Sequence, residues 1–170
     1  MKRMRIKWWR AFPLDIDTIV IDTDGVLTDG KIYLTDTGDK MFKRFGPDDH
    51  DAIIAARNAG IRVIIVSADR SGLAISEARA KHMHSEFAHV PSRDRAGHLV
   101  RDHDVHLDDA LYIGDGFHDN VTMQLFAVSA APADACASAR RAADIVSSRA
   151  GGDRAVAEII SYVLKRKGKK

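Results

Sequence analysis

DIDTIVIDTDGVLTDG, residues 15–30, joins an apolar run to a group of acidic residues. The run is rich in isoleucine and valine, which favour a buried β-strand, and the Asp24-Gly25 pair after it favours a turn. We therefore predict a strand over 15–23 with Asp22 and Asp24 at its end. Two carboxylates about 4 Å apart repel each other by about 4 kcal/mol at an effective dielectric constant of 20. A bound cation would turn this repulsion into attraction, and Mg²⁺ prefers such oxygen ligands.

Short apolar runs alternate with helical patterns along the rest of the chain. This alternation predicts an α/β fold with a doubly wound parallel sheet covered by helices on both faces. The two alternating halves of Lys31–Phe45, around Asp36-Thr37-Gly38-Asp39, predict a β-hairpin. Further strands are predicted at 61–66, 86–90, 110–113, 127–129 and 144–147. Helices are predicted to begin at Pro47, at Ser71 and Ser92 as capping residues, at about Asp119, and at Asp153, with this last helix running to Lys165.

Polar side chains follow several of these predicted strands. Ser67 comes directly after the strand over 61–66, and Asp115 follows the strand that ends at Ile113. Arg95 lies near the start of the helix that follows Val90. Because ligands of parallel α/β sheets bind at the carboxyl ends of the strands, we expect these residues to meet Asp22 and Asp24 at one edge of the sheet.

Basic residues gather at the two ends of the chain. Ten of the 26 lysines and arginines lie in residues 1–10 and 165–170, which contain no acidic residue. The 16 that remain face 24 acidic residues, so the body of the protein is acidic. This balance disfavours nucleic acid as a partner. We predict a basic N-terminal arm at 1–14, one domain at 15–165 and a basic tail at 166–170.

The sequence excludes several other kinds of site. Cys136 is the only cysteine, which rules out an intrachain disulfide and a CxxC zinc site and predicts a cytoplasmic location. No apolar run approaches the ~20 residues that a membrane-spanning helix needs. An EF-hand loop starting at Asp22 fails at Val26 and Leu27, and a G-x-G-x-x-G dinucleotide motif over 114–119 fails at Asp119.

DTDGVLTDG, Asp22 to Gly30, resembles the first motif of the haloacid dehalogenase (HAD) superfamily, D-x-D-G-[TV]-L-T-D-G. The following hairpin, the length and the lack of an inserted domain are similar to the 3-deoxy-D-manno-octulosonate 8-phosphate phosphatase group. The C-terminal domain of some sialic acid cytidylyltransferases shares this pattern. Ser67 falls at the second motif, and Asp115 with Asp119 fits the D-x-x-x-D of the fourth. The resemblance, over about 15–165, implies a HAD-like, Rossmann-like sheet with a β-hairpin flap and no cap domain.

The resemblance implies a role for each of these residues. Asp22 would attack phosphorus and form an aspartyl-phosphate, while Asp24 would protonate the leaving oxygen and later accept a proton from water. Ser67 and Arg95 would bind the phosphoryl oxygens.

A magnesium site is implied as well. Its ligands would be the carboxylates of Asp22 and Asp115 and the main-chain carbonyl of Asp24. Asp119 would lie behind these ligands and orient a metal-bound water or Arg95.

The sequence departs from the family pattern at several motifs. Arg95 stands where the family usually has lysine, and Ser67-Ala68-Asp69 replaces Thr-Gly-Arg, with Arg70 one place later. In the fourth motif, Gly116 and His118 replace the usual Asp and Asn. These departures concern the part of the pocket around the leaving group, for which the candidate substrate contacts are Asp49, Arg70 and His118.

The function that the resemblance implies is a Mg²⁺-dependent phosphomonoesterase. Its substrate would be a small sugar-acid phosphate such as 3-deoxy-D-manno-octulosonate 8-phosphate or a related metabolite. Without a cap domain, something must exclude water from the site. In the group that the chain resembles, subunits do this within a tetramer built around their hairpins, so the resemblance and the matching hairpin at Lys31–Phe45 imply a homotetramer. The alternatives are a HAD-like oligomerisation or regulatory module with little or no phosphatase activity and, less favoured by the charge balance, a nucleic-acid binder acting through the basic ends.

Overall fold

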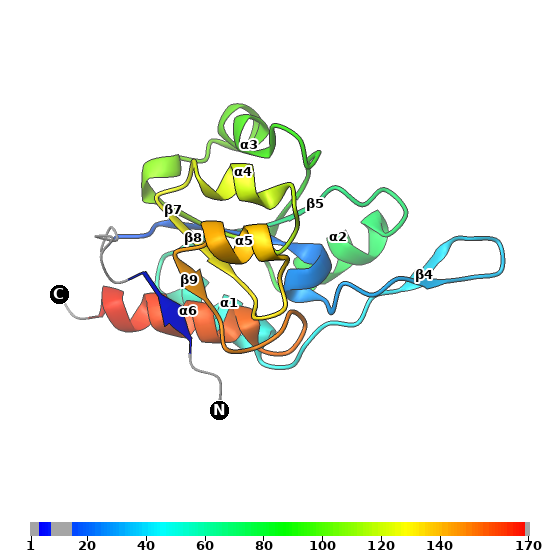
Figure 1. Ribbon diagram of the computed structural model, residues 1–170, viewed down its shortest axis with the longest axis horizontal. Coiled ribbons are helices and arrows are strands. Elements are labelled where there is room, and N and C mark those ends of the chain that lie inside the picture. The colour runs from blue at the N-terminus through cyan, green and yellow to red at the C-terminus, as the bar shows by residue number, and fades with distance from the viewer. Residues whose placement is uncertain (1–3, 8–14, 169–170) are drawn as a thin grey trace.

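The computed structural model describes residues 4–7 and 15–168 of the 170-residue chain. Most of the predicted N-terminal arm and the last two residues of the predicted tail lie outside the described residues. The described part is built on a seven-stranded sheet with the order β1-β9-β8-β7-β2-β5-β6 (Figure 1). Its strands are β1 (Arg5–Ile6), β2 (Thr18–Asp22), β5 (Arg62–Ser67), β6 (Glu86–His89), β7 (Ala110–Ile113), β8 (Val128–Ala131) and β9 (Ile145–Val146).

Every neighbouring pair of strands is parallel except β1 with β9, which is antiparallel. β2 occupies the centre, between β5 and β7, and all of its residues are buried. The predicted strands are therefore present to within a few residues at each end, and the predicted doubly wound parallel sheet is confirmed. A strand buried on both faces explains why the sequence before Asp22 is almost continuously apolar.

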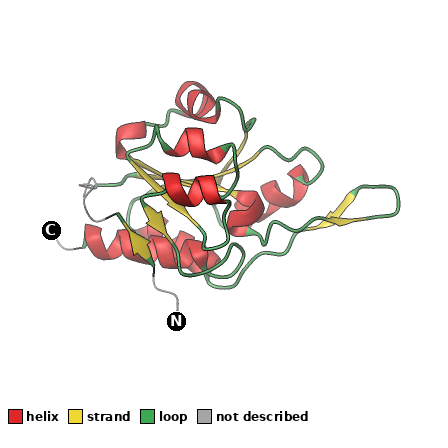
Figure 2. Ribbon diagram, in the orientation of Figure 1, coloured by secondary structure: helices red, strands yellow, loops and turns green. Residues whose placement is uncertain are grey.

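Helices cover both faces of this sheet (Figure 2). Alternate strand residues point to opposite faces, so Ile19 and Ile21 of β2 join one core while Val20 joins the other. The first core includes apolar residues of α1 (Asp49–Asn58), α2 (Leu73–His82) and α6 (Ala155–Lys167), and the second those of α3 (Arg95–His103), α4 (Asp119–Met123) and α5 (Ala137–Ala142).

Several local expectations were wrong. Ser71 and Ser92 do not cap α2 and α3, because these helices begin after Gly72 and Asp94, and neither of those residues forms a side-chain capping bond. The hydroxyl of Ser71 donates instead to Oδ1 of Asp69, at 2.9 Å. The short helix α5 was not predicted, since six residues are too few to show a helical period.

The ends of the chain also differ from the expected arm and tail. Arg5–Ile6 adds an edge strand to the sheet, and Lys7 donates to the carbonyls of Arg141 and Ala142 at the C-terminal end of α5. Cations are favoured there by the helix dipole. At the other end, α6 continues to Lys167, two residues past the predicted boundary.

The predicted hairpin forms a separate two-stranded sheet of β3 (Tyr33–Leu34) and β4 (Lys40–Phe42). It projects from the body of the protein, on the right in Figure 1. Among the described residues, no separate cap domain covers the carboxyl ends of the strands, and no helix has the length and apolar character needed to cross a membrane.

Candidate active site

The carboxyl ends of the central strands bring together polar residues from distant parts of the sequence. Asp22 is the last residue of β2, Ser67 is the last residue of β5, and Asp115 lies two residues beyond β7. Arg95, the first residue of α3, is buried with its Nη1 atom 3.3 Å from Oδ1 of Asp22. The structure thus places four of the predicted site residues at one edge of the sheet.

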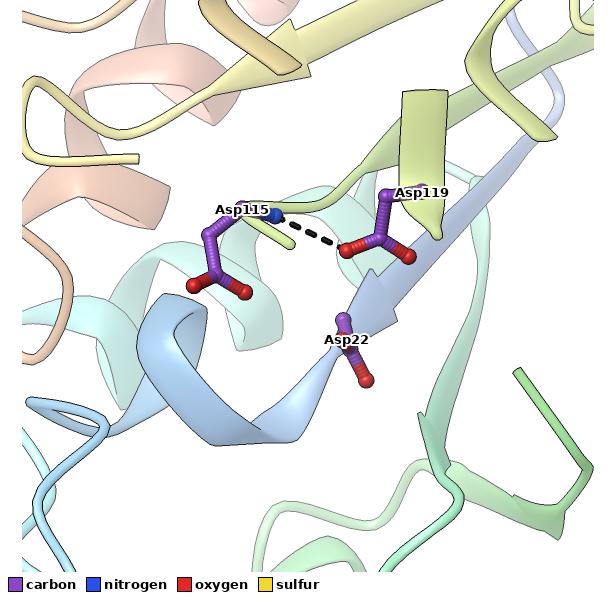
Figure 3. Close-up of side chains that lie close together, drawn as sticks. All are labelled: Asp22, Asp115 and Asp119. Atoms are coloured by element: carbon purple, nitrogen blue, oxygen red, sulfur yellow. Dashed lines mark hydrogen bonds between the residues drawn. The ribbon is translucent and has the colours of Figure 1, made fainter. Parts of the chain in front are cut away.

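Three carboxylates cluster at this edge. Oxygens of Asp22, Asp115 and Asp119, one from each residue, all lie within 4.8 Å of one another (Figure 3). Such a set of hard oxygen donors suits a divalent cation, which would also relieve the repulsion between the carboxylates. The donor chemistry of these residues therefore fits a metal ion.

Asp119 differs from the other two carboxylates because protein donors already occupy it. Its Oδ2 atom accepts hydrogen bonds from the main-chain N–H groups of Asp115 and Gly116, at 3.1 and 2.8 Å. Its Oδ1 atom accepts a bond of 3.0 Å from Arg95. Through these hydrogen bonds Asp119 can orient Arg95 and the loop at Asp115 and Gly116.

Burial makes two of the carboxyl groups weak acids. Desolvation is the largest influence on Asp22 and, although the charge of Arg95 opposes it, raises the pKa to about 7. Desolvation likewise raises the pKa of Asp115 to about 8, and the charges of Asp22 and Asp119 add to the effect. A cation held by Asp22 and Asp115 would compete with these protons, so metal binding and deprotonation are coupled.

Two glycines allow the chain to close around the cluster. Gly25, in the turn η1 (Thr23–Leu27) after β2, has a φ of +84°, and a Cβ atom there would lie 2.2 Å from Oδ2 of Asp115. A Cβ atom at Gly151 would lie 1.9 Å from the carbonyl oxygen of Gly25. Gly151 was not among the site residues predicted from the sequence, although the Gly151-Gly152 pair was a signal for close backbone approach.

Arg95 is held by Tyr112, a residue that was not predicted to belong to the site. Its Nη1 atom donates to the hydroxyl of Tyr112 at 2.6 Å, and this hydroxyl in turn donates to Oδ1 of Asp119. Tyr112 lies in β7 and is completely buried. The only signal in the sequence was a single polar atom in an otherwise apolar strand.

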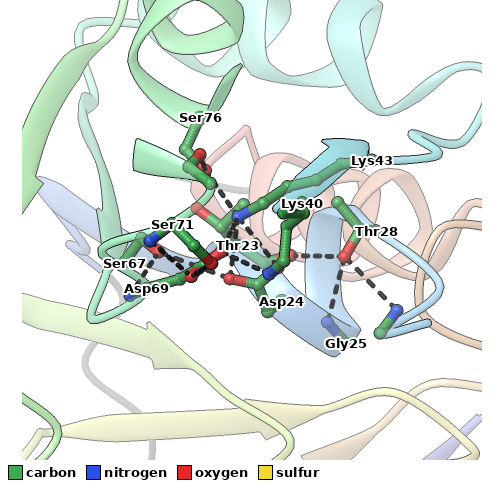
Figure 4. Close-up of polar contacts among 12 residues, drawn as sticks. Thr23, Asp24, Gly25, Thr28, Lys40, Lys43, Ser67, Asp69, Ser71 and Ser76 are labelled. Atoms are coloured by element: carbon green, nitrogen blue, oxygen red, sulfur yellow. Dashed lines mark hydrogen bonds and ion pairs between the residues drawn. The ribbon is translucent and has the colours of Figure 1, made fainter. Parts of the chain in front are cut away.

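Asp24 lies on the other side of the site, where the hairpin segment meets the body (Figure 4). Nζ of Lys43 is 2.9 Å from both carboxylate oxygens of Asp24, and Oγ of Ser67 donates to Oδ2 at 3.3 Å. Lys43 also contacts Ser76 and Asp69, and Lys40 binds Asp69. Neither Lys43 nor Ser76 was predicted as a site residue. Lys43 belongs to a basic stretch of the sequence, which is typical of a strand face exposed to solvent.

The three candidate substrate contacts lie in different surroundings. Asp49 is buried, and its Oδ1 atom accepts a hydrogen bond of 2.8 Å from the main-chain N–H of Ala157 in α6; it does not belong to the cluster of Asp22, Asp115 and Asp119. Arg70 is exposed beside Asp69. His118 is exposed and lines, with Arg95, a pocket of about 230 Å³ between the start of α3 and α4.

The chain is similar to known phosphatases. No family model matches the chain. It is 29% identical over 156 residues to the 3-deoxy-D-manno-octulosonate 8-phosphate phosphatase KdsC of Salmonella typhi, and the alignment covers 91% of this chain and 82% of the relative.

Solved structures of phosphatases also match this chain. The cobalt-bound deoxy-D-mannose-octulosonate 8-phosphate phosphatase of Haemophilus influenzae matches with a TM-score of 0.82 and 28% identity, covering 92% of this chain and 91% of the other. The 3-deoxy-D-manno-octulosonate 8-phosphate phosphatase of Moraxella catarrhalis, in complex with a magnesium ion, a phosphate ion and a KDO molecule, matches with a TM-score of 0.80 and 26% identity, covering 90% and 88%. The similarity thus extends over nearly the whole fold.

Proposed function

We propose that this chain, which resembles the 3-deoxy-D-manno-octulosonate 8-phosphate phosphatases in sequence and fold, is a metal-dependent phosphatase of the HAD superfamily that hydrolyses the phosphate monoester of a small sugar acid, with Mg²⁺ as its metal. 3-Deoxy-D-manno-octulosonate 8-phosphate or a related metabolite is the proposed substrate. The observation that carries the proposal is the convergence of Asp22 and Asp115, from β2 and the loop after β7, whose oxygens lie within 4.8 Å of each other and form hard donors that suit a divalent ion.

We assign the nucleophile to Asp22. Its carboxylate attacks phosphorus, the bond from phosphorus to the ester oxygen breaks, and an aspartyl-phosphate forms. Arg95, at 3.3 Å from Oδ1 of Asp22, is close enough to bind a phosphoryl oxygen that approaches this carboxylate. Asp119 and Tyr112 hold the guanidinium in place through their contacts with its Nη1 atom.

Asp24 is the proposed proton-transfer residue. It donates a proton to the leaving oxygen in the first step, and in the second it accepts a proton from the water that hydrolyses the aspartyl-phosphate. The side chain of Asp24 is 37% exposed, whereas that of Asp22 is 13% exposed, so Asp24 is the more accessible to the leaving group and to water. Ser67, which is fully buried and bonded to Asp24, is proposed to bind a second phosphoryl oxygen.

The Mg²⁺ ligands would be the carboxylates of Asp22 and Asp115 and the main-chain carbonyl of Asp24. When bound, the ion supplies positive charge that lets an anionic carboxylate approach an anionic phosphate. The protonated state that burial favours in Asp22 and Asp115 would then be replaced by the ionised state that nucleophilic attack requires.

The proposed assembly is a homotetramer formed through the hairpins. Four apolar side chains of the hairpin are 46–64% exposed: Leu34, Met41 and Phe42 of the two-stranded sheet, and Ile32 just before it. The ring of Phe42 stacks on Tyr33 with the centroids 4.6 Å apart. A two-stranded sheet with so much exposed apolar surface is stable only when it is covered. Hairpins of neighbouring subunits would cover it and would also shield the adjacent active sites from water.

The test is phosphate release from a panel of sugar and sugar-acid phosphates with the full-length chain. Release should require Mg²⁺, stop when EDTA is added, and be abolished by Asp22→Asn, because an amide cannot attack phosphorus as a carboxylate does. Folding of the variant is checked by circular dichroism. A folded wild-type protein that releases no phosphate from any compound would contradict the proposal and favour an oligomerisation or regulatory module.

A further inference from the structure

Lys43 holds one of the most buried ammonium groups described in the structure. Its side chain is 1% exposed, although the residue lies just beyond β4 on the projecting hairpin segment. Burying an ammonium group is costly unless it is paired and hydrogen-bonded. The groups around Nζ must therefore offset the cost of burying this charge, and their identities indicate the role of the ammonium group.

Three side chains surround Nζ of Lys43 (Figure 4). The carboxylate of Asp24 lies 2.9 Å away, Oγ of Ser76 in α2 lies 2.8 Å away, and Oδ2 of Asp69 lies 3.0 Å away. Asp69 is also bound by Lys40. The ammonium thus contacts Ser76 in α2 and Asp69 in the loop before α2. Its remaining contacts are with both carboxylate oxygens of Asp24.

We propose that Lys43 is a positioning residue for proton transfer: it holds the carboxylate of Asp24 in the orientation that faces the leaving group, and so links the placement of the hairpin to catalysis. The inference rests on the proposed function, because it takes Asp24 as the proton-transfer residue. Without Lys43, Oγ of Ser67 at 3.3 Å is the remaining described side-chain contact of a carboxylate that is 37% exposed and free to rotate.

The choice of leaving group separates this role from a purely structural one. Breaking the ester bond of an alkyl phosphate releases a strongly basic alkoxide, so proton donation by Asp24 is needed in that step. p-Nitrophenyl phosphate releases a weakly basic phenolate that leaves without a proton. In the first phosphoryl transfer, which kcat/KM reports, a residue that acts through Asp24 affects the alkyl phosphate much more than p-nitrophenyl phosphate, whereas general loss of structure affects both alike.

The experiment compares Lys43→Met with wild type on a sugar phosphate and on p-nitrophenyl phosphate, both with Mg²⁺. We expect kcat/KM, which reports the first phosphoryl transfer and not the hydrolysis of the aspartyl-phosphate that both substrates share, to fall at least about 30-fold on the sugar phosphate and less than about threefold on p-nitrophenyl phosphate, within the range of general acid catalysis. Lys40→Met is the matched control, because Lys40 contacts Asp69 without contacting Asp24, and it should preserve the ratio of the two activities. Ser76→Ala removes one anchor of Lys43 and should shift the ratio in the same direction by a few-fold.

Chemical rescue guards against a folding defect. Lys43→Cys treated with 2-bromoethylamine regains an ammonium at nearly the original position, and the sugar-phosphate activity should recover. Treated wild type controls for modification of Cys136. Thermal melting of each variant is measured in parallel.

Several results would overturn the positioning role. They are an equal loss on both substrates, no loss on either, or absence of rescue in a folded protein. A wild-type protein that releases phosphate from neither substrate would contradict the proposed function itself, which keeps the two failures distinct.

Discussion

Gly25 and Asp115 are in direct contact: a Cβ atom at Gly25 would lie 2.2 Å from Oδ2 of Asp115. The two residues belong to the turn after β2 and the loop after β7, so this contact limits how closely the two sides of the carboxylate cluster can approach. Gly25 also has a φ of +84°, where other residues are strained. Position 25 therefore needs a glycine both for the turn and for the placement of a proposed metal ligand.

Gly25→Ala should impair the site more than the fold. Strain at a positive φ costs about 1–3 kcal/mol, and the new methyl group must also displace the carboxylate of Asp115. We expect activity to fall at least about 100-fold and the Mg²⁺ concentration for half-maximal activity to rise. Gly38→Ala is the control, since Gly38 has a φ of +86° with nothing within 4 Å of its Cβ position. Equal activities of the two variants would contradict this account.

Arg95→Lys should retain more activity than Arg95→Met. The ion pairs and the hydrogen bond that join Arg95 to Asp22, Asp119 and Tyr112 all involve the single atom Nη1, so one ammonium group can reproduce much of the arrangement. We expect kcat within about tenfold of wild type for the lysine variant and a loss of about 100-fold or more for methionine. Steady-state kinetics on one sugar phosphate decides the matter. The prediction fails if lysine is no better than methionine, which would show that the planar guanidinium is needed.

The metal-free protein should lose stability as the pH rises. Burial raises the pKa values of Asp22 and Asp115 to about 7 and about 8, well above the ordinary value of 3.8 for aspartate, so the folded state binds protons more tightly than the unfolded chain. Their contribution to stability is full below about pH 4 and is lost as the pH rises through 7 and 8. Melting temperatures in EDTA should therefore fall between pH 6 and 9.

Mg²⁺ should reverse this trend. Because the ion competes with protons for Asp22 and Asp115, it should raise the melting temperature more at pH 8.5 than at pH 6. Differential scanning fluorimetry with and without Mg²⁺ at each pH measures the effect. Asp115→Asn should flatten both the pH dependence in EDTA and the response to Mg²⁺. A response to Mg²⁺ that is equal at both pH values would show that the ion does not bind at these carboxylates.

The hairpin should determine the state of assembly. Leu34→Glu combined with Met41→Glu places charges on the exposed apolar surface, so we expect the tetramer to dissociate and the phosphatase activity to fall as the site opens to water. Light scattering after size exclusion gives the mass. Asp36→Lys in the hairpin turn is the control and should have the mass of the proposed tetramer. A monomeric wild-type protein with full activity would contradict the proposed assembly.

Most of the sheet could be predicted from local patterns. A strand buried on both faces must be apolar along its length, so the runs before Asp22, Ser67 and Asp115 identified three strands and the positions at which they end. The rule that parallel strands present ligands at their carboxyl ends then placed these residues on one edge. The composition and spacing of the chain were sufficient for that inference, because each step depends on residues close together in the sequence.

The partners of these residues depend on packing between distant segments. Lys43 reaches Ser76 across 33 positions, and Arg95 reaches Asp119 across 24, while Tyr112 resembles a core residue in the sequence. Helix boundaries at Gly72 and Asp94 likewise followed from loop geometry and not from the serines nearby. Periodicity and propensity describe how one segment folds, but the contacts of a buried ammonium or hydroxyl are set by which other segments pack against it. The site's backbone framework is thus a local property of the chain, and its hydrogen-bond network is a property of the assembled fold.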